Sequence, residues 1–142
     1  MQLDQQVSVL HACGVSQAIT SELLSQWKEE GFNDHVQKVR DFYKEKRDIC
    51  HKLASKYLSD LAEWSMPTAG MFMWFKCNGI DDTKTMIETK AREENVLLVP
   101  GQAFRPDNNP SPHVRASFSI TPEDKLEEGF SRLRKVLLSS KQ

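Results

Sequence analysis

The chain has 142 residues, of which 39% are hydrophobic and 27% are charged, the composition of an ordinary folded domain. Nineteen Lys and Arg residues against twenty Asp and Glu residues give a net charge of −1, so no basic nucleic-acid-binding surface is expected. The longest apolar run, 69–75, is far too short for a membrane span, and the first residues do not read as a secretory signal. Three cysteines without a CxxC spacing argue against a disulfide framework or zinc cluster and favour a reducing, intracellular compartment.

Apolar residues at helical spacing predict two helices in the first part of the chain. Ser16 has the residue type of an N-cap, and Gly31 is expected to end the helix that follows it. Asn33 is expected to cap a longer helix over about residues 33–58. Its apolar stripe is formed by Val36, Val39, Tyr43, Cys50, Leu53 and Tyr57.

Two strands, 62–66 and 71–77, are predicted next. The residues between them, 67–70, read Pro-Thr-Ala-Gly and have the chemistry of a hairpin turn. Met71, Met73 and Trp74 are interpreted as core residues that pack against the helices.

A third helix is expected to begin at Asp81 or Asp82 and to end at Asn95 in the left-handed conformation. An apolar strand is predicted over 96–99. After a loop over 102–112, a second strand is predicted over 113–120.

The final helix is predicted to start with Thr121 as the N-cap and Pro122 as the first helical residue. Leu126, Phe130, Leu133 and Leu137 form its core stripe. The order of elements predicts an α/β fold in which helices pack on a small, few-stranded sheet.

Arg115 is the most informative single residue for function. In the strand 113–120, Val114, Ala116, Phe118 and Ile120 alternate with polar residues, which places Arg115 on the opposite, polar face. A guanidinium group matches a carboxylate or phosphate through two parallel hydrogen bonds. The alternative interpretation is an arginine exposed on the sheet surface without a ligand.

The remaining candidates for chemistry are weak. The segment 99–104 follows a buried strand, where loops often line sites, but Pro100 and Gly101 also suit a simple turn. The four histidines have no metal-ligand spacing. No Gly-rich phosphate loop and no Gly-x-Ser-x-Gly nucleophile motif occurs in the sequence.

Several stretches together resemble one family. They are 6–11 (QVSVLH), 16–27, 29–32 (EEGF), 35–36, 41–43 (DFY), 61–64 (LAEW), 67–74 (PTAGMFMW), 99–104 (VPGQAF) and 114–119 (VRASFS). In this order they resemble the C-terminal region of fold-type I, pyridoxal-phosphate-dependent aminotransferases, and especially the kynurenine/2-aminoadipate and aromatic aminotransferase group. The likeness covers nearly the whole chain.

The resemblance implies a domain organisation. Residues 1–28 would be the tail of the large, cofactor-binding domain with an interdomain helix, and residues 29–142 would be the small C-terminal domain. In such a fragment, a contiguous apolar patch should be exposed around Val7 to Leu24 and on the inner face of the sheet.

The resemblance also implies a site. Arg115 would bind the α-carboxylate of the substrate, and Leu10, Gly70, Pro100, Gly101 and Phe104 are weaker candidates for its pocket. The cofactor-binding lysine, the acid that pairs with the pyridine nitrogen and the phosphate-binding residues of the family would all lie upstream of this region. Lys76, in the predicted strand 71–77, has no such surroundings and is interpreted as a surface residue.

The parent enzyme would thus transfer an amino group between an L-amino acid (kynurenine, 2-aminoadipate or an aromatic amino acid) and a 2-oxo acid, as a homodimer in the cytoplasm or mitochondria. This chain alone is expected to be inactive and to bind neither pyridoxal phosphate nor a metal, a nucleic acid or a membrane. Two alternatives remain open. One is a truncated, non-catalytic product with an interaction role. The other is an amino-acid-binding module of ferredoxin-like type, although that fold requires a βαββαβ order.

Overall fold

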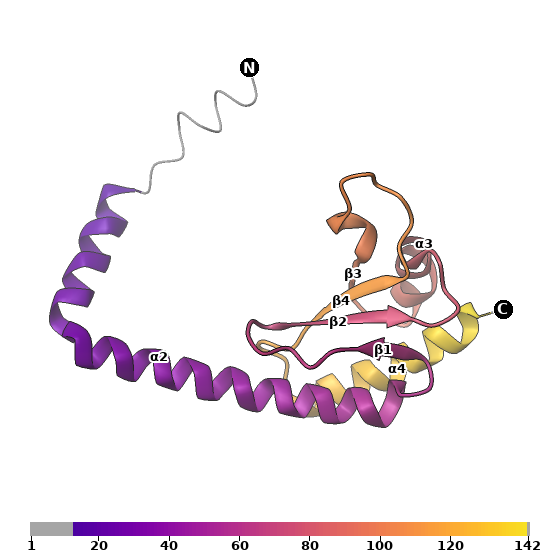
Figure 1. The fold of residues 1–142 in the computed structure, drawn as a ribbon, viewed down its shortest axis with the longest axis horizontal. Coiled ribbons are helices and arrows are strands. Elements are labelled where there is room, and N and C mark those ends of the chain that lie inside the picture. Colours follow the sequence, from indigo (N-terminus) through magenta and orange to yellow (C-terminus); the bar gives the residue numbers. More distant parts are fainter. Residues whose placement is uncertain (1–12, 142) are drawn as a thin grey trace, which may run out of the picture. The chain divides into compact units, whose positions relative to one another are not determined.

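A computed structural model describes residues 13–141 of the chain. The predictions that concern residues 1–12, including the candidate Leu10, lie outside the described residues. Contacts divide the chain into two compact units, 1–41 and 42–142, which are considered separately. Helix α2, Gly14–Leu58, contributes to both units (Figure 1).

The helix break in the first unit does not lie where the sequence predicted it. Two helices follow one another, as predicted, but the break between them is a kink at Lys28, with φ 53° and ψ −166°, and not an end at Gly31 with a restart at Asn33. A Cβ on Gly31 would lie 3.1 Å from Cβ of Trp27. The glycine therefore leaves room for the Trp27 side chain beside the kink, which explains its presence without a terminating role. The helix also starts at Gly14, two residues before the predicted cap Ser16.

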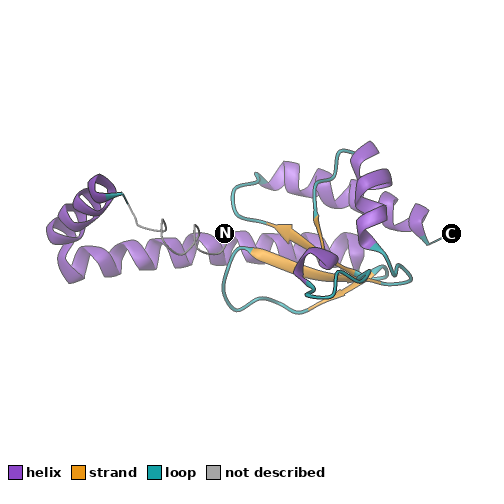
Figure 2. Cartoon of the chain, turned by 90° about the horizontal axis from the view of Figure 1, so that it is seen from above, coloured by secondary structure: helices purple, strands orange, loops and turns teal. Residues whose placement is uncertain are grey.

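The second unit contains a four-stranded antiparallel sheet with the strand order β1-β2-β4-β3 (Figures 1 and 2). The strands are β1 (Ala62–Trp64), β2 (Phe72–Cys77), β3 (Val99–Pro100) and β4 (His113–Ser117). The predicted α/β class and the two hairpin strands are confirmed, although β1 ends at Trp64 and not at residue 66. The strand predicted over 96–99 lies instead at Val99–Pro100, and the strand predicted over 113–120 ends at Ser117. Leu97 is 95% exposed and Ile120 is 85% exposed, because neither residue belongs to the sheet.

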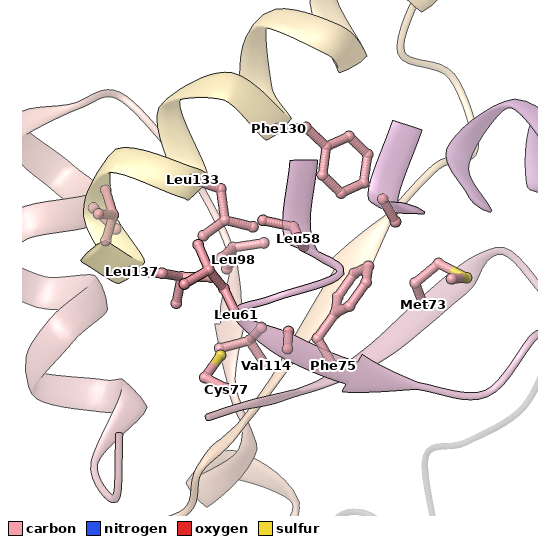
Figure 3. Packing of buried hydrophobic residues seen from close by; sticks show 14 of the residues in the cluster. Leu58, Leu61, Met73, Phe75, Cys77, Leu98, Val114, Phe130, Leu133 and Leu137 are labelled. Carbon is pink, nitrogen blue, oxygen red and sulfur yellow. The ribbon is translucent and has the colours of Figure 1, made fainter. Parts of the chain in front are cut away.

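One face of the sheet forms the core. Met73, Phe75 and Cys77 alternate along β2 with exposed residues, and all three are buried. They pack with Leu58 of α2 and with helix α4, Glu123–Ser140, whose Phe130, Leu133, Val136 and Leu137 are buried (Figure 3). The rings of Phe75 and Phe130 lie 6.2 Å apart, edge to face. On the other face, named here the open face, Phe72, Trp74 and Lys76 of β2 are exposed within the second unit.

A short helical segment connects β2 to β3. Helix α3, Thr83–Met86, is capped by Asp82, whose carboxylate accepts hydrogen bonds from the amides of Lys84 and Thr85. The chain continues through one π-helical turn, η1 (Ile87–Ala91), and then reaches Asn95 at φ 55°, which confirms the predicted left-handed residue.

The start of α4 differs from the prediction by one residue. Pro122 is the N-cap, with an extended ψ of 153°, and Thr121 lies outside the helix. Proline fits this position because the first amides of a helix have no intrahelical acceptor, so a missing N–H costs nothing.

The three cysteines are expected to react very differently with an alkylating reagent. Burial raises the pKa of the Cys50 and Cys77 thiols to about 12, so at neutral pH they carry almost no thiolate. Cys13 is exposed, and hydrogen bonds from the amides of Ser16 and Val15 lower the pKa of its thiol. Iodoacetamide at pH 7.5 should therefore modify Cys13 first, as read by peptide mass spectrometry, and should reach Cys50 and Cys77 only in denaturant. Equal modification of all three thiols in the folded chain would contradict the buried positions.

Candidate functional site

Arg115 lies in the middle of the sheet, on its open face. β4 is flanked by β2 and β3, and Arg115 pairs in register with Trp74 on one side and Val99 on the other. Its neighbour Val114 is fully buried on the core face, so the alternation of the strand turns Arg115 to the opposite face. The side chain is half-buried. This position confirms the predicted face of Arg115.

Aromatic rings surround the guanidinium group. Its central carbon lies 4.1 Å from the centre of the Phe72 ring, in β2, and 4.8 Å from that of Phe104, in the 3-10 helix η2 (Gly101–Phe104). Trp74 packs edge to face on Phe104 at 5.3 Å and stacks on His113 at 5.4 Å with 17° between the planes. Phe72, Trp74 and Phe104 are each 40–48% exposed. The open face thus carries a cation inside an aromatic cluster, named here the aromatic face and formed by Phe72, Trp74, Phe104, His113 and Arg115.

Within residues 13–141, the Arg115 guanidinium has no carboxylate partner. Two cations near the same face are already neutralised: Lys76 pairs with Glu63 at 3.4 Å, and Arg105 pairs with Asp107 at 2.6 Å. Hydrogen bonds from Arg105, together with those from Asn109, hold the pKa of the Asp107 carboxyl well below its usual range. Arg115 therefore keeps its hydrogen-bond donors free for an anion.

An arginine without an ion pair costs more free energy when it is half-buried, as Arg115 is, than when it is exposed. Arg40 and Arg92 also have no carboxylate partner in the described structure, but both are exposed and water solvates them. A half-buried guanidinium loses part of that solvation, which is costly unless an anion or another polar group replaces it. The free edge of the guanidinium has the geometry to bind a carboxylate or a similar planar anion.

A braced loop places Phe104 beside Arg115. Gly101 is buried so tightly that a Cβ would lie 2.5 Å from Oγ of Ser111 and 2.8 Å from the carbonyl oxygen of His113. The fully buried Thr83 hydroxyl lies 2.9 Å from the carbonyl oxygen of Ser111 and 2.7 Å from that of His113. The contact at Gly101 packs η2 against the beginning of β4, and the Thr83 hydroxyl ties the same part of the chain to α3. The position of Phe104 is therefore set by close backbone packing at Gly101.

The structure brings together some of the predicted site residues and not others. Phe104 contacts Arg115, as described above. Pro100 pairs with Val114 in the sheet, and Gly101 is buried beneath the loop, so their observed contacts are structural. Gly70 lies in the exposed loop before β2 with φ +84°, and a Cβ added to it would meet nothing within 4 Å.

Sequence reasoning misses two members of the aromatic face and assigns Trp74 wrongly. It interprets Trp74 as core, together with Met71 and Met73, but only Met73 is buried; Met71 is 36% exposed and Trp74 is 40% exposed. The signal is present in the strand 72–77, where Lys76 marks the solvent face and Phe72 and Trp74 lie on the same side as Lys76. Phe72 and His113 are absent from the site predicted from the sequence.

Lys76 does not have the surroundings expected of a lysine that binds pyridoxal phosphate. Lys76, the lysine on the sheet, is half exposed and already paired with Glu63. No three His, Cys, Asp or Glu side chains between residues 13 and 141 come together as a metal site. His51 instead accepts a hydrogen bond of 3.1 Å from Nε1 of Trp64. Nor does any helix of this part of the chain have the length and apolarity needed to cross a membrane.

Sequence comparison finds aminotransferases over nearly the whole chain. It is 50% identical over 136 residues to the mitochondrial kynurenine/α-aminoadipate aminotransferase of Rattus norvegicus. This alignment covers 95% of the chain and 32% of the rat protein. It is 37% identical over 114 residues to aromatic-amino-acid aminotransferase 1 of Thermococcus litoralis, covering 78% of the chain and 27% of that protein. No protein-family profile matches the chain.

Solved structures give the same result for the fold. LysN, the α-aminoadipate aminotransferase of Thermus thermophilus, superposes with a TM-score of 0.81 at 27% identity, over 97% of this chain and 34% of LysN; that crystal structure contains N-(5′-phosphopyridoxyl)-L-leucine. The kynurenine aminotransferase of Pyrococcus horikoshii superposes with a TM-score of 0.75 at 29% identity, over 82% of this chain and 29% of that protein. The chain spans about a third of the length of these relatives, and in sequence and fold it matches aminotransferases over that third, which fits a C-terminal fragment of a fold-type I aminotransferase.

Proposed function

We propose that this chain is the C-terminal part of a pyridoxal-phosphate-dependent transaminase and that Arg115 binds the α-carboxylate of its substrates. The observation that carries the proposal is the half-buried guanidinium on the aromatic face, which has no carboxylate partner among residues 13–141. An amino acid and its 2-oxo acid both present a carboxylate with the planar geometry that a guanidinium group binds through two hydrogen bonds. The same arginine can therefore serve both substrates of an amino-group transfer.

Substrate orientation is the contribution of this chain to the reaction. Two parallel hydrogen bonds to one carboxylate fix both the distance and the plane of that group, so the Cα atom beside it has a defined position. The half-buried surroundings of Arg115 strengthen these bonds by excluding part of the water. Pyridoxal phosphate, when bound, acts as the electron sink for the chemistry at Cα. The residues that hold it are proposed to lie in the part of the relatives' length that this chain does not span.

The finer assignments rest on the relatives. The names of the mammalian relatives support kynurenine and 2-aminoadipate as substrates and mitochondria as the location. The cytoplasm is the other proposed location. The helix break at Lys28 supports a division into a large-domain tail over 1–28 and a small domain over 29–142. Exposed apolar residues of α2 (Val15 at 68%, Ile19 at 65% and Leu23 at 41%) support a further domain that covers them. A homodimer is proposed for the intact enzyme.

The test is to isolate the native polypeptide with an antibody against this region, to determine its mass, and to assay amino-group transfer from kynurenine or 2-aminoadipate to a 2-oxo acid. A polypeptide about three times longer, with pyridoxal-phosphate-dependent activity, is the expected result. The 142-residue chain assayed alone is expected to be inactive. A native species of 16.3 kDa would instead favour a truncated, non-catalytic product or an amino-acid-binding module. Rapid transamination by the purified chain would contradict the proposal directly.

A further inference from the structure

The contacts of Arg115 come from both sides of its strand. Phe72 belongs to β2 and pairs in register with Ser117, two residues from Arg115 on the same face. Phe104 follows β3, the neighbour of β4 on the opposite side. Both rings lie within cation–π distance of the guanidinium carbon, at 4.1 and 4.8 Å. Two rings from separate elements thus hold one flexible side chain.

We infer that Phe72 and Phe104 are positioning residues, which hold the Arg115 guanidinium in the orientation that receives a substrate carboxylate. The inference rests on the proposed function of Arg115. An arginine side chain has many rotamers, and a bidentate hydrogen bond requires one of them. The Phe72 and Phe104 rings restrict the rotamers of Arg115 by packing against its guanidinium group. They do not use the N–H groups at the edge of the guanidinium, which stay available for a carboxylate. The rings therefore order Arg115 without occupying the donors that the carboxylate needs.

A carboxylate partner could not perform this function. An acid such as Asp107, which pairs with Arg105 through two hydrogen bonds of 2.8 and 2.6 Å, uses the same edge of the guanidinium that a substrate would use. The ring contacts avoid this competition. Trp74 extends the arrangement, because it packs between Phe104 and His113 and so supports the Phe104 ring.

The first test measures the orientation of Arg115 in the 142-residue chain itself. Nuclear magnetic resonance of the arginine Nε–H and Cδ–H groups should show Arg115 signals shifted upfield by the two rings, and Arg115→Lys assigns these signals by removing them. Phe72→Leu and Phe104→Leu each retain an apolar side chain but remove the ring, so each should lose part of the shift. Phe72→Tyr and Phe104→Tyr retain the ring face and should keep it. Phe42→Leu removes a ring that is equally exposed, at 46%, and lies near Lys46 instead, so it should leave the Arg115 signals unchanged.

The second test measures kinetics in the intact polypeptide isolated as above. Each leucine variant should raise KM for the amino acid about two- to fivefold, the effect of one cation–π contact, with kcat nearly unchanged. Each tyrosine variant should restore the normal KM. A general loss of structure would lower kcat and the thermal midpoint together, and tyrosine would not selectively rescue it.

The possible failures can be told apart. If Arg115→Lys changes KM strongly but the leucine variants change neither KM nor the Arg115 signals, the positioning inference is wrong and the carboxylate-binding role stands. If Arg115→Lys leaves kcat/KM unchanged, the carboxylate-binding role is wrong, whatever the signals show.

Discussion

Arg115→Lys is expected to lower kcat/KM of the intact transaminase about 100-fold, equivalent to ~2.7 kcal/mol of transition-state stabilisation. Lysine keeps the positive charge but offers a single ammonium group, so it cannot form two parallel hydrogen bonds to one carboxylate. It also loses the flat surface that contacts the Phe72 and Phe104 rings. The effect should appear for both the amino acid and the 2-oxo acid, since both carry the carboxylate. Steady-state kinetics with each substrate varied in turn measures it.

Arg92→Lys is the matched control for this prediction. Arg92 is exposed and has no ion pair in the described structure, so its replacement tests the general effect of exchanging an unpaired arginine. We expect kcat/KM to stay within about twofold of the starting value, as for most exposed positions. If Arg115→Lys behaves like Arg92→Lys, Arg115 is a surface residue of the sheet, which is the alternative interpretation of the sequence.

Local periodicity is sufficient to predict most of the fold. Apolar and polar residues alternate in 71–77 and 113–120, which identifies both central strands, and the apolar stripe of Phe130, Leu133 and Leu137 identifies the last helix. Burial repeats every two residues in a strand and about every 3.6 residues in a helix, so even a short segment shows which of the two it is. The same alternation identifies the open face that carries Arg115. The alternation of residues does not predict where each strand ends. A strand ends where its hydrogen-bonded neighbour leaves the sheet, and the alternation can continue beyond that point.

The aromatic face cannot be predicted from short sequence segments, because its residues come from separate elements of the fold. Phe72, Phe104 and Arg115 lie far apart in the sequence and meet only through the strand order β1-β2-β4-β3. Trp74 could have been placed on this face from its spacing with Lys76, because residues two apart in a strand share a face. The kink at Lys28 has no such signal, since lysine is not a residue that favours positive φ. Gly31 lies close to the kink, three residues after Lys28, but its role there is to leave room for the Trp27 side chain.

Gly101→Ala is expected to destabilise the chain by ~1–3 kcal/mol, the cost of forcing extra volume into a well-packed site. The new Cβ would lie 2.5 Å from Oγ of Ser111 and 2.8 Å from the carbonyl oxygen of His113. Ser111 is 3% exposed and cannot turn into solvent, and the second contact is with backbone. The loop must therefore move away from β4. For a domain of this size the thermal midpoint should fall by roughly 5–15 °C, which circular dichroism on the isolated chain can follow.

The same substitution should also affect Arg115, because η2 carries Phe104. Displacement of the loop would reduce the upfield shift of the Arg115 signals, as Phe104→Leu does, although residue 101 does not contact the guanidinium. Ser111→Ala in the Gly101→Ala background removes the 2.5 Å contact but leaves the one with the His113 carbonyl, so it should restore only part of the lost stability. Gly129→Ala is the control: a Cβ there meets nothing within 4 Å, and alanine in the interior of α4 should stabilise the chain by ~0.5–1 kcal/mol. If Gly101→Ala behaved like Gly129→Ala, close packing at Gly101 could not be what places Phe104 beside Arg115.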